Sequence, residues 1–160
     1  MELQSLPRIE PEKASLFLTS TRGIYFWFNK ETDELVYIGV AIGTGGLKKR
    51  IISQHLNPSY LEYRPEKHTS KDKFQLQHSV YRINKDEKLM RQGIDKSSFR
   101  KSIGRKLELK PGNETVRYII ENLYLKVHES ESVSFIKEAE IALIKKYQPI
   151  FNTSHKPQNT

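Results

Sequence analysis

Two short runs of aromatic and β-branched residues, close together in the sequence, constrain the fold of this chain most strongly. Gly23–Asn29 reads GIYFWFN and Leu35–Ala41 reads LVYIGVA, and both compositions are typical of β-strands. The five residues between them, 30–34, are polar and suit a turn. Two strands joined by so short a polar segment usually pair in an antiparallel hairpin. We therefore expect a β-hairpin over residues 23–41.

The other regular elements expected from the sequence are a basic helix, a third strand and a long C-terminal helix. Three glycines end the second strand, and a helix predicted over residues 47–56 stops at Asn57-Pro58. Residues 122–129 alternate enough to form a strand, and residues 132–147 have the strongest helical pattern in the chain. Ser132 suits the N-cap of that helix, and Gln148-Pro149 ends it. The pattern predicts an α+β protein.

The less regular parts of the sequence indicate how the chain is organised. Residues 1–20 are expected to form an N-terminal extension, in which residues 15–19 are either a short strand or a packing segment. Residues 21–152 are expected to form one domain, interrupted by a polar insertion at about 57–115. Residues 153–160 are polar and are predicted to be a disordered tail.

The insertion is predicted to be basic and helical. A short helix is expected over residues 97–109, because apolar residues recur there at four-residue intervals. These apolar residues are Phe99, Ile103 and Leu107. The basic residues that make the insertion a candidate DNA-contacting surface are Arg100, Lys101 and Arg105. A solvated peripheral subdomain is the alternative reading of the same composition.

Charge and composition narrow the classes of partner. The 27 Lys and Arg outnumber the 19 Asp and Glu, which gives a net charge of +8 and favours a polyanion such as nucleic acid. A generic basic protein would show the same excess. The chain has no cysteine, so disulfides and thiolate zinc sites are excluded. No signal peptide and no apolar run near the roughly 20 residues of a membrane span are evident, so a soluble, cytoplasmic protein with no membrane partner is expected.

One carboxylate lies on the apolar side of the C-terminal helix. On a helical wheel Glu140 falls between Ile136 and Ile144, near the centre of the apolar arc. The other residues of that arc are Ala139, Leu143 and Tyr147. A buried, unpaired carboxylate is costly, so it must be paired, protonated or bound to metal. The sequence leaves open a salt bridge to a Lys or Arg and a role as a metal ligand.

Several motifs in this order resemble the GIY-YIG nuclease superfamily. Gly23-Ile24-Tyr25 and Tyr37-Ile38-Gly39 match the two halves of its signature, with the twelve-residue separation of the tyrosines that the family shows. The segment ending in Arg50 looks like the family's first helix, which carries a catalytic arginine. Residues 140–149 resemble the Glu-bearing helix in the nuclease domain of the bacterial excision-repair enzyme, and Asn152 matches the asparagine that closes the motif.

The resemblance covers residues 23–56 and about 122–152, and it implies a three-stranded antiparallel sheet flanked by helices. It also implies one Mg²⁺ or Mn²⁺ ion per active site, held by Glu140, by waters and by a substrate phosphate, as suits a hard cation. It places Tyr25 near the nucleophilic water and Arg50 on the scissile phosphate. Tyr37 is expected to support the site by hydrogen bonding, or to be purely structural. Gly39 and Asn152 are expected to support the site structurally.

One position departs from the family pattern. Several members carry a His or Tyr one helical turn after the arginine, whereas this chain has Gln54 there and His55 one residue later. One residue rotates a side chain by about 100° around an α-helix, away from the face that Arg50 and Gln54 share. His55 therefore reaches the site only if the helix is irregular, and is otherwise a structural or surface residue. Lys48 and Lys49 are candidate phosphate and DNA contacts.

The resemblance implies a metal-dependent endonuclease that hydrolyses DNA phosphodiester bonds. The size of the chain suits a restriction-type or mobile-element-associated nuclease, in which the insertion reads the target. A single site cuts one strand, so a double-strand cut would need a dimer or two successive events. Two alternatives stay open: a catalytically silent nucleic-acid-binding module on the same scaffold, and an interaction protein whose basic surface binds a protein or RNA.

Overall fold

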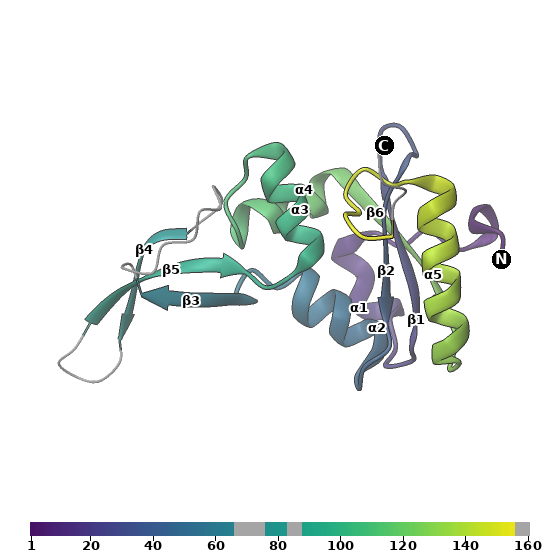
Figure 1. The fold of residues 1–160 in the computed structure, drawn as a ribbon, viewed down its shortest axis with the longest axis horizontal. Coiled ribbons are helices and arrows are strands. Elements are labelled where there is room, and N and C mark those ends of the chain that lie inside the picture. The colour runs from purple at the N-terminus through teal and green to yellow at the C-terminus, as the bar shows by residue number, and fades with distance from the viewer. Residues whose placement is uncertain (66–75, 83–87, 156–160) are drawn as a thin grey trace.

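The structure is a computed structural model that describes residues 1–65, 76–82 and 88–155, with side chains for residues 1–62 and 93–155. The described residues form two three-stranded antiparallel sheets, with strand orders β2-β1-β6 and β3-β5-β4. In Figure 1 the first sheet lies between helix α5 on one side and the helices α1, α2, α3 and α4 on the other, and the second sheet extends away from it. The expected α+β class with a three-stranded antiparallel sheet is confirmed.

The first sheet contains the predicted hairpin and the predicted third strand. Strands β1 (Gly23–Asn29) and β2 (Leu35–Ala41) pair antiparallel, with Tyr25 opposite Gly39. Strand β6 (Leu123–Glu129) pairs with the other edge of β1. Strand β1 is central and β2 lies at the edge of the sheet. Groups from the two faces of the sheet can therefore meet beside the outer edge of β2.

Alternation along β1 divides the core into two layers. Tyr25 and Trp27 belong to a cluster on the face covered by the helices that follow the hairpin. Ile24, Phe26 and Phe28 belong to a second cluster, on the face covered by α5. Successive side chains of a strand point to opposite faces, so a fully buried central strand needs apolar residues throughout. This explains the continuous aromatic and aliphatic sequence of β1.

Helix α5 (Val133–Tyr147) begins where the sequence predicted, because the Ser132 hydroxyl accepts a hydrogen bond from the Phe135 backbone N–H at 3.3 Å. Ile136 and Ile144 are buried, as the helical wheel predicts, but Tyr147 is 44% exposed. After the helix the chain turns back, and Phe151 is buried in the core cluster on the other face of the sheet. Its N–H donates to the Val36 carbonyl at 2.9 Å.

The helix after the hairpin differs from the regular α-helix that was expected. A single α-turn, α2 (Gly46–Lys48), leads into a π-helix, η3 (Lys49–His55). Its first turn packs tightly against the chain before β1. Gly46 has φ 54°, and a Cβ there would meet the carbonyl oxygens of Ser20 and Thr21. The wider winding of η3 changes which residues share a face, and this decides the geometry of the site.

The region predicted as a helical insertion contains a second sheet. It is built by β3 (Leu61–Pro65), β4 (Leu76–Arg82) and β5 (Lys88–Asp95), and it is followed by α3 (Ser98–Leu107) and α4 (Asn113–Asn122). Helix α3 is the helix that the sequence predicted, and its Phe99 and Ile103 are fully buried, whereas Leu107 is 41% exposed. Neither the sheet nor α4 was predicted. The strands were missed because charged residues interrupt the alternation on which a strand prediction depends.

The two ends of the chain differ in part from expectation. Residues 15–19 do not form a strand, because helix α1 (Ala14–Phe17) occupies most of that segment, but Leu18 is buried and packs against the core as the other reading proposed. Two 3-10 turns, η1 (Leu3–Ser5) and η2 (Pro11–Lys13), precede α1. Residues 156–160 of the predicted tail lie outside the described residues. Among the described residues, no helix is both long and apolar enough to cross a membrane.

Candidate active site

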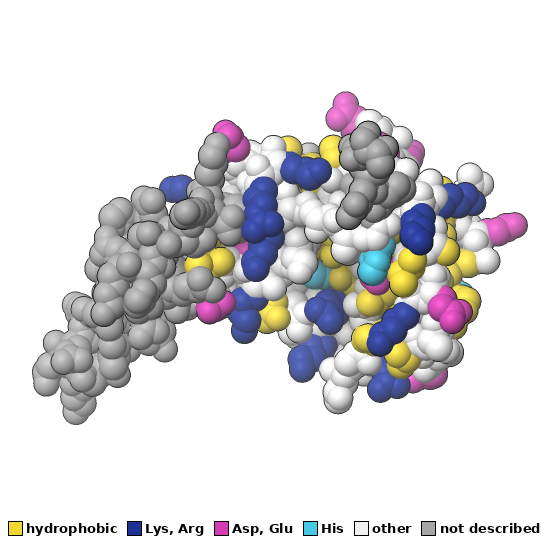
Figure 2. Space-filling view, in the orientation of Figure 1, with side chains coloured by type: hydrophobic (Ala, Val, Ile, Leu, Met, Phe, Trp, Pro, Cys, Tyr) yellow, Lys and Arg dark blue, Asp and Glu magenta, His cyan; other side chains and the backbone are white. Residues whose placement is uncertain are grey.

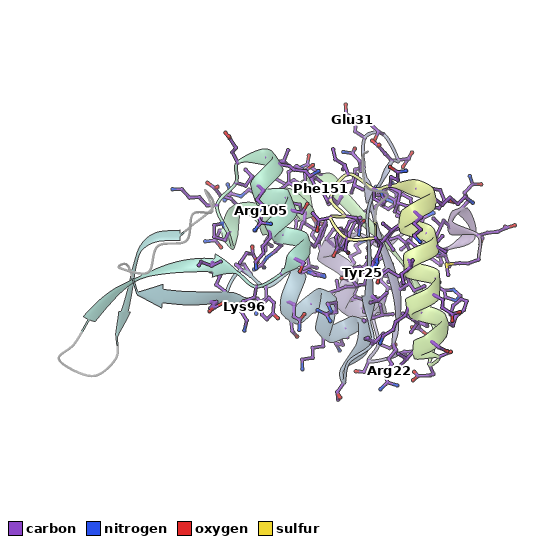
Figure 3. The ribbon with its side chains drawn as sticks, in the orientation of Figure 1. Arg22, Tyr25, Glu31, Lys96, Arg105 and Phe151 are labelled. Carbon is purple, nitrogen blue, oxygen red and sulfur yellow. The ribbon has the colours of Figure 1, made fainter. Side chains whose placement is uncertain are left out.

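A cavity of about 210 Å³ lies beside strand β2, and most of the residues singled out from the sequence line it. Helix α5 packs mainly against β2, and the cavity lining combines groups from both layers that cover the sheet. Figure 3 shows Tyr25 on the sheet, between the helix that starts at α2 and α5 in that view. The lining residues come from β1, β2, η3, the start of α3 and α5: Tyr25, Tyr37, Gly39, Val40, Arg50, His55, Lys96, Ser97, Ser98 and Glu140.

Tyr25 lies across the backbone of the partner strand at Gly39. A Cβ at Gly39 would overlap the Tyr25 ring, so only glycine at this position leaves room for it. The Tyr37 ring lies beside it, with centroids 6.2 Å apart. Burial raises the pKa of Tyr25 well above its usual value, and the neighbouring Tyr37 raises it further. Burial also raises the pKa of Tyr37 to about 12, so both hydroxyls are protonated at neutral pH.

The π-helix brings His55 into the site. Backbone hydrogen bonds in a π-helix join residues five apart, so His55 lies on the same side of η3 as Arg50. Its Nε2 is 2.6 Å from the Tyr25 hydroxyl, and its ring is almost completely buried. Burial, together with the smaller effects of the Arg50 and Arg100 guanidinium groups, lowers the pKa of His55 to about 3. His55 is therefore neutral at pH 7, with one nitrogen free to accept a proton.

Arg50 lies at the border of two hollows. It lines the cavity that contains the two tyrosines, and it also lines a neighbouring depression of about 250 Å³ with Lys49 and Gln54. Its Nη1 donates to the Gln54 side-chain oxygen at 3.1 Å, which orients the guanidinium along the helix. A guanidinium placed in this way can bind two oxygens of a phosphate group.

Glu140 reaches the cavity from α5 with 19% of its side chain exposed, and burial raises its pKa. Within the described part of the chain, its one ion pair is with His155, at 3.7 Å, and no bridge to a Lys or Arg is present. The His155 contact shifts the Glu140 pKa in the opposite direction, downward. Of the two readings left open by the sequence, the lysine or arginine bridge is thus not observed.

The donor set is compatible with a hard divalent cation. The described side chains contain no group of three His, Asp or Glu residues that could enclose a metal by themselves. Mg²⁺ does not need such a group, because it commonly keeps several waters and binds through one or two carboxylates and substrate phosphates. A single half-buried carboxylate that opens into a cavity with an arginine fits this mode of binding, and Glu140 is that carboxylate.

Asn152 lies away from the cavity and holds the edge of the sheet. Its side-chain amide donates to the Ile38 carbonyl at 2.8 Å and accepts from the Ile38 N–H at 2.9 Å. The residue is 5% exposed. These two bonds act as a short extra strand along β2, between the positions of Tyr37 and Gly39. Asn152 is therefore placed to fix the backbone that carries both site residues.

The basic residues proposed as DNA contacts have different surroundings. Arg100 is completely buried and paired with Asp95, so its assignment as a DNA contact is wrong. Arg105, Lys48 and Lys49 are exposed and Lys101 is half-buried, so they stay predicted contacts. Lys48 does not line the cavity, whereas Lys49 lines the depression beside it. Figure 2 shows Lys and Arg side chains over α3 and over the helix that starts at α2.

Sequence reasoning missed the residues that α3 contributes to the cavity. Lys96, Ser97 and Ser98 line it at the point where strand β5 passes into the helix. The serine before a helical pattern is a recognisable N-cap signal. Nothing in the local sequence indicates that the same hydroxyl meets His55, which is 42 positions earlier in the chain.

Comparison of the chain with protein-family models, with curated proteins and with solved structures found no match.

Proposed function

We propose that this protein is a metal-dependent endonuclease of the GIY-YIG type, which hydrolyses phosphodiester bonds in DNA. One observation carries the proposal: two tyrosines from paired strands, an arginine and a histidine from one helix and a glutamate from another helix line the same cavity. These groups are separated by up to 115 positions in the sequence, from Tyr25 to Glu140. Their types match the requirements of phosphodiester hydrolysis, which needs an oriented nucleophile and stabilisation of charge at phosphorus.

The proposed role of Tyr25 is to position the attacking water. Because neutral His55 can accept the Tyr25 hydroxyl proton through Nε2, the tyrosine oxygen keeps lone pairs for the water. As the water oxygen bonds to phosphorus and the bond to the leaving sugar oxygen breaks, one water proton passes to Tyr25. At the same time Tyr25 passes its own hydroxyl proton to Nε2 of His55, and the leaving sugar oxygen takes up a proton from solvent. Burial is the main cause of the low His55 pKa, and a phosphate anion beside Arg50 would oppose the smaller contribution of the two guanidinium groups.

Arg50 and Glu140 are proposed to handle the charges of the substrate. Arg50 binds the non-bridging oxygens of the scissile phosphate through its guanidinium. Glu140 would hold one Mg²⁺ or Mn²⁺ ion, which would supply charge stabilisation as the phosphodiester bond is broken. Burial raises the pKa of Glu140, whereas a cation in the cavity would favour the ionised form of the carboxylate.

The proposed partner is DNA, bound through the exposed basic residues near the site. A net charge of +8 favours association with a polyanion, and the affinity is expected to fall steeply with salt. One cavity contains one set of reacting groups. A double-strand cut would therefore require two copies of the chain or two successive cuts.

The proposal is tested by incubating purified protein with plasmid and single-stranded DNA, with Mg²⁺, with Mn²⁺ and with a chelator. Cleavage is expected with either metal and not with the chelator. Glu140→Ala and Tyr25→Phe are each expected to lower the rate by at least about a hundredfold, in the range that single catalytic groups contribute. Glu138→Ala is the matched control, because Glu138 is an exposed glutamate on the same helix.

Two results would count against the nuclease proposal. Cleavage that persists in Glu140→Ala would remove this carboxylate from the mechanism. Salt-dependent DNA binding by the wild-type protein, with no cleavage under any metal condition, would identify a nucleic-acid-binding module without hydrolytic activity.

A further inference from the structure

The second ring nitrogen of His55 is occupied by a residue from the other side of the cavity. Nδ1 lies 2.7 Å from the Ser97 hydroxyl, and Nε2 lies 2.6 Å from the Tyr25 hydroxyl. The imidazole is thus held between two hydroxyl groups, one from β1 and one from the start of α3. Ser97 is 3% exposed, so water does not compete freely for this contact.

Ser97 is itself fixed by the start of α3. Its hydroxyl oxygen accepts a hydrogen bond from the Arg100 backbone N–H at 3.2 Å, as an N-cap residue does. Its own backbone N–H donates to the Asp95 carboxylate at 3.1 Å. The Ser97 side chain therefore has a defined direction before His55 is considered.

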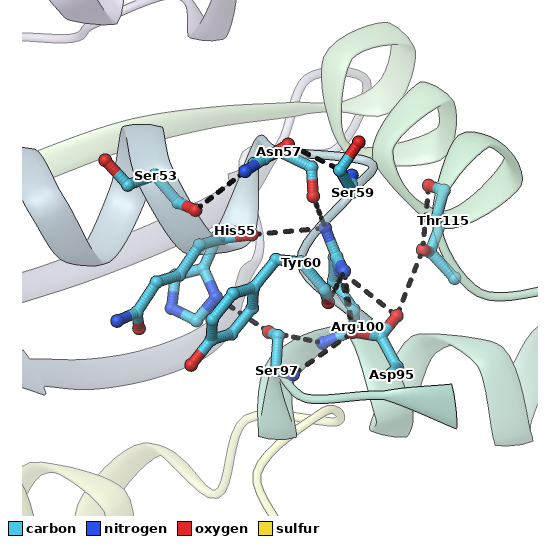
Figure 4. Close-up of polar contacts among 11 residues, drawn as sticks. Ser53, His55, Asn57, Ser59, Tyr60, Asp95, Ser97, Arg100 and Thr115 are labelled. Carbon is cyan, nitrogen blue, oxygen red and sulfur yellow. Dashed lines mark hydrogen bonds and ion pairs between the residues drawn. The ribbon is translucent and has the colours of Figure 1, made fainter. Parts of the chain in front are cut away.

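A buried ion pair joins this turn to the end of the π-helix. Asp95 and Arg100 are both 0% exposed and are 2.8 Å apart. The Arg100 guanidinium also donates to backbone carbonyls of Gln54 at 3.1 Å, Asn57 at 2.5 Å and Tyr60 at 2.7 Å. Figure 4 shows these contacts converging on one side chain. Arg100 therefore holds the segments on both sides of the His55–Ser97 contact.

The two distances fit either tautomer of the neutral imidazole, because each ring nitrogen meets a hydroxyl group that can donate or accept. A neutral histidine has one N–H and one acceptor nitrogen. The Ser97 oxygen accepts from Arg100 and has a second lone pair that can accept from Nδ1–H of His55. Nε2 is then the acceptor and receives the Tyr25 proton. In the opposite tautomer, Nε2–H would point at the Tyr25 oxygen and occupy the lone pair that the attacking water needs.

We propose that Ser97, held by the Asp95–Arg100 pair, is a positioning residue that keeps His55 in the Nδ1–H tautomer, with Nε2 available to Tyr25. The choice of this tautomer rests on the proposed nuclease function, because it leaves a Tyr25 lone pair for the water, but the tautomer is measured without any cleavage. Ser97 is uncharged, so it orients the imidazole without favouring the protonated, positively charged form of the ring. The Asp95 carboxylate, which accepts from the Ser97 N–H, is paired with Arg100.

The tautomer is measured by NMR on protein labelled with ¹⁵N in histidine, at neutral pH and without DNA or metal. Long-range ¹H–¹⁵N correlations distinguish a protonated from an unprotonated ring nitrogen, and His55→Gln identifies the His55 signals by their loss. The wild-type protein is expected to carry the proton on Nδ1. Ser97→Ala is expected to shift the population toward Nε2–H, and Ser97→Thr, which keeps a hydroxyl and a cap, is expected to restore the wild-type pattern.

Ser132→Ala is the matched control for the loss of an N-cap. Ser132 caps α5 in the same way, by accepting from the N–H three residues later, and α5 does not contribute to the His55 hydrogen bonds. This variant is expected to leave the His55 signals unchanged. In DNA cleavage, Ser97→Ala is expected to lower kcat by at least about tenfold with little change in KM, because it alters the base relay more than the phosphate contacts.

The outcomes separate this inference from the proposed function. A wild-type proton on Nε2, or an unchanged tautomer in a folded Ser97→Ala protein, would overturn the inference even if DNA is cleaved. The expected tautomers with no cleavage by wild type would support the inference and remove the nuclease proposal. Should Ser97→Ala not fold, the wild-type spectrum and Ser97→Thr still decide the assignment of the tautomer.

Discussion

Loss of the ion pair between Asp95 and Arg100 is expected to destabilise the fold by about 3–5 kcal/mol, because it leaves one charge buried without a partner. Both side chains are fully buried, so water cannot replace the missing partner without a local opening of the structure. Asp95→Asn keeps the shape and one acceptor oxygen, which favours the lower end of the range. Arg100→Met leaves the Asp95 charge and also three backbone carbonyls without their donor, which favours the upper end.

This magnitude is measurable because the chain has a single tryptophan, Trp27. It is fully buried, and its ring stacks on Phe99 of α3 with a centroid distance of 5.5 Å. Its fluorescence in a urea titration therefore reports on the same helix that carries Arg100. A loss of 3–5 kcal/mol is a large part of the roughly 5–15 kcal/mol that stabilises a typical domain. The midpoint should fall strongly without a change in slope.

The control breaks an exposed ion pair instead. Glu131→Gln removes the 3.8 Å contact with Arg22, in which the Glu131 side chain is 72% exposed. Exposed pairs contribute about 0–1 kcal/mol, so this variant should unfold close to the wild-type midpoint. A loss below about 1 kcal/mol in Asp95→Asn would contradict the reasoning. So would full additivity in the double variant Asp95→Asn/Arg100→Met, because partners in contact should show a coupling energy.

Three further perturbations test other parts of the site. Gly39→Ala should displace the Tyr25 ring and lower the cleavage rate at least about tenfold, whereas Gly43→Ala, whose Cβ would meet nothing within 4 Å, should not; equal rates would contradict the packing argument. His55 has a pKa of about 3 in the fold and about 6.5 when unfolded, so its contribution to stability is complete above pH 6.5 and is lost as the pH falls toward 3. The free energy of unfolding, measured by urea titration at several pH values, should therefore change with pH by about 1.4 kcal/mol per pH unit more in wild type than in His55→Gln within that window. Parallel pH profiles of the two proteins would refute the assignment. Asn152→Ala removes both bonds to β2 and should cost about 1–3 kcal/mol in the same assay; a loss within error of zero would show that the edge does not depend on them.

The sequence predicted the elements whose signals are local. The hairpin over residues 23–41 and the helix after Ser132 have the bounds of the observed elements to within a residue, because strand composition, turn length and capping act over a few positions. The position of Glu140 among buried isoleucines also follows from periodicity alone. Such features depend little on the rest of the chain.

The features that were not predicted depend on distant partners. Arg100 is a basic residue on a predicted amphipathic helix, and only its pairing with Asp95 explains why it is buried. The π-helix changes the direction of His55, and a wheel drawn at about 100° per residue cannot represent it. The second sheet was hidden by the charged residues of its strands. In each case the local pattern was compatible with a different, more regular structure.

The winding of η3 has a consequence for how such sites are searched for. One additional residue between an arginine and a histidine is absorbed by a wider turn, so a separation of five in the sequence becomes neighbourhood in space. A pattern search with a fixed separation of four would reject this chain, although its imidazole touches the tyrosine hydroxyl. Deletion of one residue from that turn would restore regular winding with the histidine four positions after the arginine, so the imidazole would keep the face that it shares with the guanidinium.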